Sequence, residues 1–242
     1  PAAAGVQVTV LEPKDVVGGG IRSAEAVVPG LLHDECAAIH PMVPASIFAA
    51  QHRLTDHGLE WLAPDVDLAH PLDDGTAGVL HQSVEETAAG LGPDGRRWRR
   101  LFGRPSARFD MLAADIFKPL VRVPDHPIEM ARFGAPTMLP ATVLGRIFRT
   151  PAARALFGGV AAHAIQPLHR PLSSAIGMGI LTAGHHNGWV VARGGTQAIA
   201  DAMQKRLLAL GGRIETATRI DDAAQLPMAD ITMFDLTPES VA

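Results

Sequence analysis

The stretch from residue 6 to residue 23 constrains the fold more than any other part of the chain. It opens with a short apolar run, Val6–Leu11, which is rich in β-branched residues and ends in an acid, Glu12. Such a run is typical of a strand buried on both faces of a parallel sheet. Three glycines follow at 18–20, where the backbone can turn sharply and approach a ligand because no Cβ intervenes. This order of features predicts an α/β fold with a ligand site at the carboxyl end of the strand.

The polar residues of this stretch suit a nucleotide. In a dinucleotide-binding βαβ unit, an acid at the carboxyl end of the second strand accepts hydrogen bonds from the adenosine ribose, a role that Glu12 can fill. Lys14 lies two residues on, where a cation can face a phosphate or the ribose edge. Free N–H groups in a glycine turn favour an anion. The alternative interpretation is a strand followed by a glycine-rich loop that binds nothing.

The same residues resemble the second half of the FAD-binding signature in the superfamily of amine oxidases and phytoene desaturases. In that pattern an acid ends a strand, five residues intervene, and a glycine doublet, a small or basic residue and a Ser or Thr follow. The corresponding residues here are Glu12, Gly18, Gly19, Gly20 and Ser23. The variant resembles most the phytoene-desaturase-like branch of pyridine nucleotide-disulfide oxidoreductase domain proteins. Many members carry Arg directly after the doublet, whereas this chain has Gly20 there and Arg22 two places later.

The residues before this stretch predict the end of a helix. Ala2–Ala4 read as a last helical turn, and Gly5 stands where a helix commonly ends. No G-x-G-x-x-G turn followed by a helix occurs in the chain, although a Rossmann unit needs one for the pyrophosphate. We therefore expect an internal fragment of a larger flavoprotein, cut at both ends, which does not hold FAD stably or act on substrate by itself.

The chain returns to an α/β pattern near its end. A Gly-Gly-Thr sequence at 194–196 precedes a periodic apolar helix that stops at a second glycine pair, 211–212. Arg213–Ile220 and Ala229–Phe234 then read as two strands. The resemblance implies that Ile220 contacts the adenine through its backbone. It also implies that the strand ending near Thr237 rejoins the FAD-binding domain.

These observations predict an incomplete, Rossmann-like FAD/NAD(P)-binding domain of the α/β class with an inserted, mostly helical α+β substrate domain. We expect residues 1–45 to be the first segment of the FAD-binding domain and 191–242 to be its return segment. Residues 46–190 would form the substrate domain. Within it we expect helices near 44–57, 83–91, 110–120, 139–148 and 151–165 and a hairpin turning at 73–75. Ser83 and Thr150 are the expected N-caps, and Gly58 is expected to stop the first helix. We expect a turn at His185–Asn187, with the lining of a pocket as the alternative.

Composition narrows the class of protein. Of 242 residues, 47% are hydrophobic and 19% are charged, as in globular proteins with a sizeable core. The net charge of −4 argues against a nucleic-acid binder. The single cysteine, Cys36, excludes an internal disulfide and suits a reducing, cytoplasmic setting. The run of His, Asp, Glu and Cys at 33–36 lacks the spacing of a metal site, so we expect no metal.

One basic cluster carries interleaved aromatics. Arginines stand at 96, 97, 99, 100 and 104 around Trp98 and Phe102. The favoured interpretation is a solvated helix face over two buried aromatics. A surface that meets anionic lipid or a partner is the less favoured alternative. Two histidines stand in mainly apolar surroundings in the sequence. We interpret His163 as a hydrogen-bonded core residue, and the resemblance places His40 on the substrate side.

The resemblance implies an FAD-dependent oxidoreductase that takes hydride from a small apolar or amine substrate. In such enzymes the flavin carries the redox chemistry, so the absence of a Ser-His-Asp or paired-carboxylate pattern is expected and no catalytic residue is assigned. Two alternatives stay open. One is a non-catalytic or degenerate flavoprotein fragment that acts as an interaction module. The other is a redox-neutral, flavin-dependent isomerase. The oligomeric state is left open.

Overall fold

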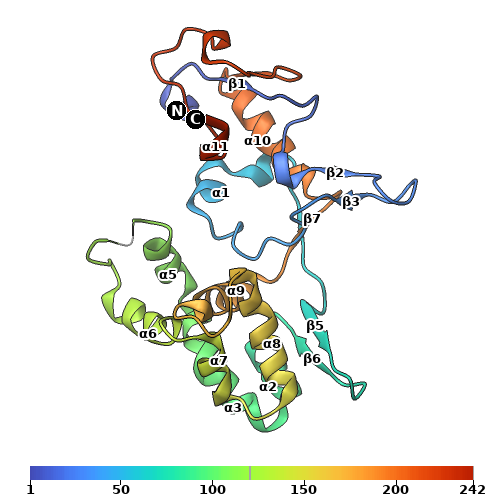
Figure 1. Ribbon diagram of the computed structural model, residues 1–242, viewed down its shortest axis with the longest axis vertical. Helices are drawn as coiled ribbons and strands as arrows, with labels where there is room; N and C mark the ends of the chain where they lie inside the picture. Colours follow the sequence, from blue (N-terminus) through green and yellow to red (C-terminus); the bar gives the residue numbers. More distant parts are fainter. Residues whose placement is uncertain (120, 242) are drawn as a thin grey trace. The chain divides into compact units, whose positions relative to one another are not determined.

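The computed structural model describes residues 1–119 and 121–241 and is a mixture of helices and short strands (Figure 1). The chain divides into two compact units. The first unit consists of Pro1–Val17 together with Leu207–Ala242, and the second is Gly18–Arg206. These limits differ from the expected segment boundaries near residues 45 and 190. The assignment of cofactor and substrate domains therefore stays a prediction.

The first unit contains a two-stranded parallel sheet. Strand β1 (Thr9–Leu11) pairs with β8 (Arg213–Glu215), and Val10 lies opposite Ile214. The short 3-10 helix Ala2–Ala4 ends at Gly5 with φ 80°, which confirms the expected last helical turn. The expectation of a strand buried on both faces was wrong, because Val10 remains 38% exposed and the sheet has only two strands among the described residues.

The expected strands near the end of the chain are largely absent. The strand predicted from Arg213 to Ile220 stops at Glu215, and 229–234 forms no strand in the described part of the chain. Exposed apolar side chains mark this second segment, including Ile231 and Met233, each 79% exposed. A strand gains its stability from a hydrogen-bonded neighbour and a covered face. Among the described residues, 229–234 has neither a partner strand nor a covered face. A capped 3-10 turn (Ala223–Gln225) and helix α11 (Pro238–Val241) complete the unit.

The second unit is built mainly from helices around one core. In chain order these are α2 (Val84–Gly90), α3 (Gly95–Trp98), α4 (Arg104–Ala107), α5 (Phe109–Ile116), α6 (Pro127–Thr137), α7 (Ala141–Leu144), α8 (Pro151–Ala161) and α9 (Ser173–Asn187). A π-helical turn, Arg99–Gly103, joins α3 to α4. The core includes the fully buried side chains of Trp98, Phe102, Phe148 and Leu181.

Helix α9 corrects the expected turn at His185–Asn187. The segment forms a 15-residue helix instead. Its small residues allow neighbours to approach closely: a Cβ on Gly177 would lie 3.0 Å from the Cα of Ala161 in α8, and one on Gly184 would overlap the Trp189 ring. Because the helix is covered on most sides, it shows no amphipathic pattern, and this explains why periodicity did not reveal it.

His185 lies near the end of α9 as a core residue. Its Nε2 accepts a hydrogen bond from Trp98 Nε1 at 2.9 Å, and its Nδ1 lies 2.9 Å from the Gln82 carbonyl oxygen. These two partners hold the neutral imidazole with its proton on Nδ1. Burial lowers the pKa of His185, although the carbonyl of Gln82 opposes the shift.

The hairpin predicted at residues 73–75 is confirmed. Strands β5 (Leu68–Pro71) and β6 (Ala77–Leu80) are antiparallel and flank that turn. The hairpin packs closely on α8, because a Cβ on Gly78 would lie 2.5 Å from the Ala152 carbonyl oxygen. Several predicted helix ends are also confirmed: Ser83 caps α2, Thr150 caps α8 and Gly58 ends the turn after α1 (Ile47–His52).

A smaller cluster gathers around helix α10 (Gln197–Ala209), which the sequence predicted. Strand β4 (Trp61–Leu62) pairs with β7 (Val191–Ala192), and β2 (Ser23–Ala24) pairs with β3 (His33–Asp34). The apolar residues buried here are Leu54, Leu59, Ala192, Ile199 and Ala202.

The two aromatic residues of the basic cluster at 96–104 are buried, as the favoured interpretation of the sequence predicts. Trp98 and Phe102 are both inaccessible to solvent. Three of the arginines form ion pairs: Arg97 with Asp94, Arg99 with Glu85 and Arg104 with Glu129. Within the described residues no helix is both long enough and apolar enough to cross a membrane.

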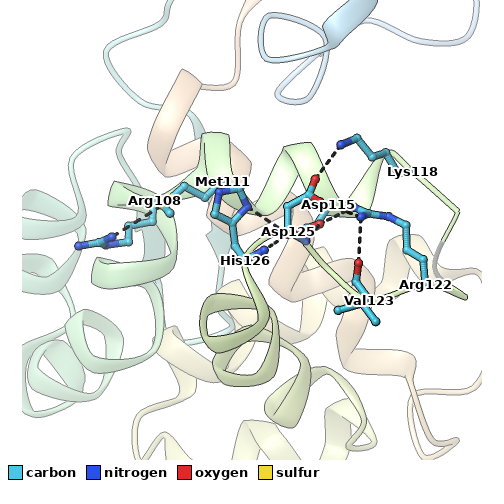
Figure 2. A network of polar contacts seen from close by, with 8 residues as sticks. All are labelled: Arg108, Met111, Asp115, Lys118, Arg122, Val123, Asp125 and His126. Atoms are coloured by element: carbon cyan, nitrogen blue, oxygen red, sulfur yellow. Dashed lines mark hydrogen bonds and ion pairs between the residues drawn. The ribbon is translucent and has the colours of Figure 1, made fainter.

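A polar network fixes the connection from α5 to α6 (Figure 2). The Asp115 carboxylate accepts the backbone N–H groups of Asp125 and His126 at 2.8 and 2.9 Å, and it also contacts the His126 ring and Arg122. Burial alone would raise the pKa of Asp115, but these hydrogen bonds outweigh it and lower the pKa to about 2. Every partner lies on the same connection, so the network acts as a structural tie.

Asp94 holds together two parts of the helical core. Its buried carboxylate accepts the backbone N–H groups of Arg149 and Thr150 at 2.8 and 2.7 Å and the Thr150 hydroxyl at 2.8 Å. Burial would raise the pKa of Asp94. The hydrogen bonds from Thr150 and Arg149 and the charge of Arg97 outweigh that effect, so the pKa is lowered.

We predict that Asp94→Ala lowers the free energy of unfolding by about 2–4 kcal/mol, because buried donors lose a charged acceptor. Equilibrium denaturation with urea measures this loss. Asp73→Ala, at an exposed position in the hairpin turn, is the matched control and should change stability little. Equal effects of the two substitutions would contradict the role of Asp94.

Candidate functional site

The candidate residues of the first unit lie at the carboxyl edge of its parallel sheet. Glu12 follows β1 directly, and its N–H donates to the Glu215 carbonyl at 2.9 Å. Beyond the last strand residues the two chains stay together, because Thr218 N donates to the Glu12 carbonyl oxygen at 2.9 Å and Ala217 N to that of Lys14 at 2.7 Å. Glu12 and Lys14 are thus fixed beside residues 217–218.

The turn beside Glu12 carries backbone strain. Ala217 has φ 51°, a left-handed conformation that is unfavourable for a residue with a Cβ. Such strain persists only where neighbouring contacts impose it, and it often accompanies a binding site. Ile220 follows three residues later and is partly buried. The structure therefore places Glu12, Lys14 and Ile220 in one unit, on chain segments that are hydrogen-bonded to each other.

This edge fits the adenosine half of a dinucleotide. In dinucleotide-binding βαβ units the ribose hydroxyls donate to a carboxylate at the end of a parallel strand, and Glu12 is a half-buried acid at such a position. One carboxylate oxygen accepts the Lys14 N–H at 2.9 Å, which fixes the side chain and leaves acceptor capacity on the group. Lys14 is exposed and adds a positive charge nearby.

The glycine turn belongs to the second unit. Gly18 and Gly19 have φ 126° and 53°, so both require the conformational freedom of glycine. Their surroundings differ: a Cβ on Gly18 would lie 3.3 Å from the Ala200 Cβ, whereas a Cβ on Gly19 would meet nothing within 4 Å. Gly20 has an ordinary backbone and packs near Cys36. Gly19 is thus the position where backbone lies open to an incoming group.

Arg22 is engaged by a neighbouring acid. Its Nε lies 3.5 Å from Glu35 Oε2, and Glu35 N donates to the Arg22 carbonyl oxygen at 2.9 Å. An anion that approaches Arg22 therefore also meets a carboxylate. In this chain the arginine stands two places later than in many members of the resembled superfamily, and at that position it forms a surface ion pair.

A buried network that sequence reasoning missed stands beside this turn. Ser23 Oγ donates to Asp34 Oδ1 at 2.6 Å, and the same oxygen accepts the Thr196 N–H at 2.7 Å. Gln197 N donates to Ser23 Oγ at 3.0 Å. The residues around 23 and 34 thus satisfy the backbone N–H groups at the start of α10, which a helix leaves without internal partners.

His40 completes the network. It is 7% exposed, its Nε2 is hydrogen-bonded to the fully buried Thr196 hydroxyl, and its ring centre lies 5.9 Å from that of Trp61. Burial lowers the pKa of His40, and the charge of Asp34 opposes this shift only in part. His40 is therefore a neutral, inward-facing histidine. Ser23 stands out in the sequence as the Ser of the glycine signature, and His40 as a residue that the resemblance places on the substrate side. Asp34 and Thr196 are common loop residues, and no spacing in the sequence indicates that they meet Ser23 and His40.

In the described part of the chain, the other histidines and acids are not arranged as the ligands of a metal site. Among residues 1–119 and 121–241, no group of three His, Cys, Asp or Glu side chains is arranged to bind a metal ion. His163 lies 3.0 Å through Nδ1 from the Val160 carbonyl oxygen and is exposed, so its expected place in the core was wrong.

The sequence matches no protein-family model and no curated protein. Its fold is similar to those of several solved structures. The PF1083 protein from Pyrococcus furiosus aligns at 15% identity and a TM-score of 0.52, covering 89% of this chain and 46% of that one. A double mutant of putrescine oxidase, made in a redesign of cofactor binding, aligns at 16% identity and a TM-score of 0.51. The alignment covers 89% of this chain and 46% of that one. A single mutant from the same redesign aligns at 15% identity and a TM-score of 0.50, and the alignment covers 88% of this chain and 46% of that one.

These similarities show that the chain shares its fold with part of the PF1083 protein and with part of putrescine oxidase. The chain spans about half the length of the structures that it matches. At this level of identity the similarity concerns the fold alone.

We predict that Gly195→Ala is more destabilising than Gly194→Ala. Both glycines have positive φ, 89° and 79°, so either substitution strains the backbone by about 1–3 kcal/mol. Only at 195 would the new Cβ also lie 2.6 Å from Ser23 Oγ, whereas at 194 it meets nothing within 4 Å. Chemical denaturation of the two variants measures the difference. Equal losses would show that the buried network does not depend on this approach.

We predict that thermal stability falls as the pH drops below 6.5, the ordinary pKa of histidine. Because burial lowers the pKa of His40 and His185, the unfolded chain takes up protons there before the folded chain does, and unfolding is favoured. Thermal melts over this pH range test the slope. His185→Gln should give a shallower slope, and His169→Gln, at an exposed position, should leave it unchanged.

Proposed function

We propose that this chain is part of an FAD-dependent oxidoreductase and that Glu12 binds the adenosine ribose of the cofactor. The observation that carries the proposal is the position of Glu12 at the carboxyl end of a parallel strand pair. The fold shared with part of an amine oxidase supports it, as does the resemblance of 12–23 to an FAD-binding signature. Neither support names a substrate.

The residues divide the task of holding the cofactor. Glu12 accepts from the ribose, Lys14 adds positive charge, and the backbone near Ile220 borders the adenine. Gly19 belongs to the second unit and is a separate candidate for contact with a nucleotide, because its backbone is open. When bound, FAD supplies the hydride-accepting chemistry, and the protein supplies orientation and exclusion of water. We propose a small apolar or amine substrate, in keeping with the resemblance to amine oxidases and phytoene desaturases.

A second candidate is a non-catalytic flavoprotein module. One observation favours it: Arg22, the basic residue after the glycine turn, is paired with Glu35. An arginine held in this way contributes less to a phosphate site than one facing the nucleotide alone. Purification of the full-length protein separates the two candidates, because bound flavin is visible by its absorbance and anaerobic bleaching by a substrate reports its reduction.

We predict that Glu12→Ala in the full-length protein weakens FAD binding by roughly 1–3 kcal/mol, the contribution of hydrogen bonds to a charged group. Fluorescence titration of the apoprotein with FAD measures the affinity. Asp15→Ala, an exposed acid three residues away, is the matched control and should bind FAD normally. Unchanged affinity in Glu12→Ala would remove this residue from the site, whatever the reaction.

A further inference from the structure

One stretch of the second unit differs sharply in charge from the rest of the chain. Residues 130–200 contain six arginines and no aspartate, glutamate or lysine. All 25 acidic residues of the protein, and the other 15 basic ones, lie outside this stretch. Helices α7, α8 and α9 fall within it (Figure 1). Acids from outside the stretch reach two of these arginines, because Arg193 pairs with Glu60 and Arg132 lies near Glu129. The positive charge considered below is that of Arg146, Arg154 and Arg170.

The same stretch exposes large apolar side chains on two neighbouring loops and on the first turns of the helices that follow them, α7 and α9. The loop before α7 and the loop before α9 are joined by backbone hydrogen bonds: Leu172 N donates to the Met138 carbonyl at 3.2 Å, and Ser174 N donates to that of Leu139 at 3.3 Å. The exposed apolar residues are Met138 (61%), Leu139 (40%), Val143 (42%), Ile165 (93%), Leu172 (49%) and Ile176 (41%). We call these six residues the apolar tip.

Two members of the apolar tip are held outward at a conformational cost. Ile165 and Leu172 have φ 49° and 67°, in the left-handed region that branched side chains avoid. Ile165 N is hydrogen-bonded to the Ala162 carbonyl and thereby ends the helical turn with its side chain in solvent. Strained backbone that presents a nearly fully exposed isoleucine is unfavourable unless the side chain finds an apolar environment.

Arginines lie beside the apolar tip. Thr142 N donates to the Leu168 carbonyl at 3.1 Å, and both residues line a groove that also contains Arg146 and Arg154. Arg154 Nε donates to the Phe148 carbonyl at 2.9 Å, which fixes one guanidinium at the groove. Arg170 follows in the loop before α9. In the described part of the chain, neither Arg146 nor Arg170 forms an ion pair with an acid.

We propose that the apolar tip docks on a bilayer surface that contains anionic lipids. Apolar side chains on loops enter the boundary of the acyl chains, and the flanking arginines contact lipid phosphates. A second copy of the chain fits less well, because two surfaces of the same positive charge repel each other. The basic cluster at 96–104 is less suited, because three of its arginines already pair with acids.

Co-sedimentation of the full chain with vesicles tests this docking. We expect binding to phosphatidylcholine vesicles that contain phosphatidylglycerol, little binding to pure phosphatidylcholine, and release at high salt. Ile165→Gly should lower the vesicle affinity about tenfold, since a large apolar group is lost. Glycine also relieves the left-handed backbone, so this variant should fold at least as stably as the parent. Arg146→Gln and Arg170→Gln should each lower the affinity roughly fivefold.

Val27→Gly is the matched control, because Val27 is 75% exposed in a loop outside the acid-free stretch. It should bind vesicles as the parent does. Equal binding with and without phosphatidylglycerol, or full binding by Ile165→Gly, would overturn the proposal. So would a lipid-free dimer that Ile165→Gly dissociates, since a second copy would then cover the tip. Displacement by inorganic phosphate but not by chloride at equal ionic strength would indicate a phosphate site instead.

Discussion

The helical core of the second unit depends on the close approach of α9 to its neighbours. Gly177 allows the start of α9 to lie against Ala161 of α8, and Gly184 leaves room for the Trp189 ring. At this distance the neutral His185 ring can bridge Trp98 and the Gln82 carbonyl. The largest buried side chains of the core, including Trp98 and Phe102, pack around this arrangement.

The sequence was most informative where a local interaction decides the structure. Ser83, Thr150 and Gly58 each act on a helix end within a few residues, and all three were recognised correctly. The sequence was least informative where burial against distant parts of the chain decides the structure. Helix α9 is covered on most sides and therefore shows no apolar stripe, while 229–234 has the composition of a strand but no partner strand in the described part of the chain.

The same distinction applies to the candidate site. The order of strand, acid and glycine turn could be recognised because it is contiguous, and the structure adds the parallel pairing that fixes Glu12 beside 217–218. The network of Ser23, Asp34 and Thr196 could not be recognised. Asp34 and Thr196 are 162 positions apart, and their contact arises only when a hairpin meets the start of α10. A single sequence holds no record of such a contact between common polar residues.

The glycine contacts around α8 and α9 also determine how this core can change over time. Gly78, Gly159 and Gly177 each lie where a Cβ would press on a neighbouring group. Glycine is the smallest residue, so every mutation at these positions adds atoms, and none can be approached through a smaller intermediate. Descendant sequences can therefore vary at Gly78 and Gly177 only after the backbone at Ala152 or Ala161 has moved, and at Gly159 only after His70 has moved or been replaced by a smaller residue. A substitution at one of these glycines therefore requires a compensating change at its neighbour, whereas residues of the exposed loops can be substituted one at a time.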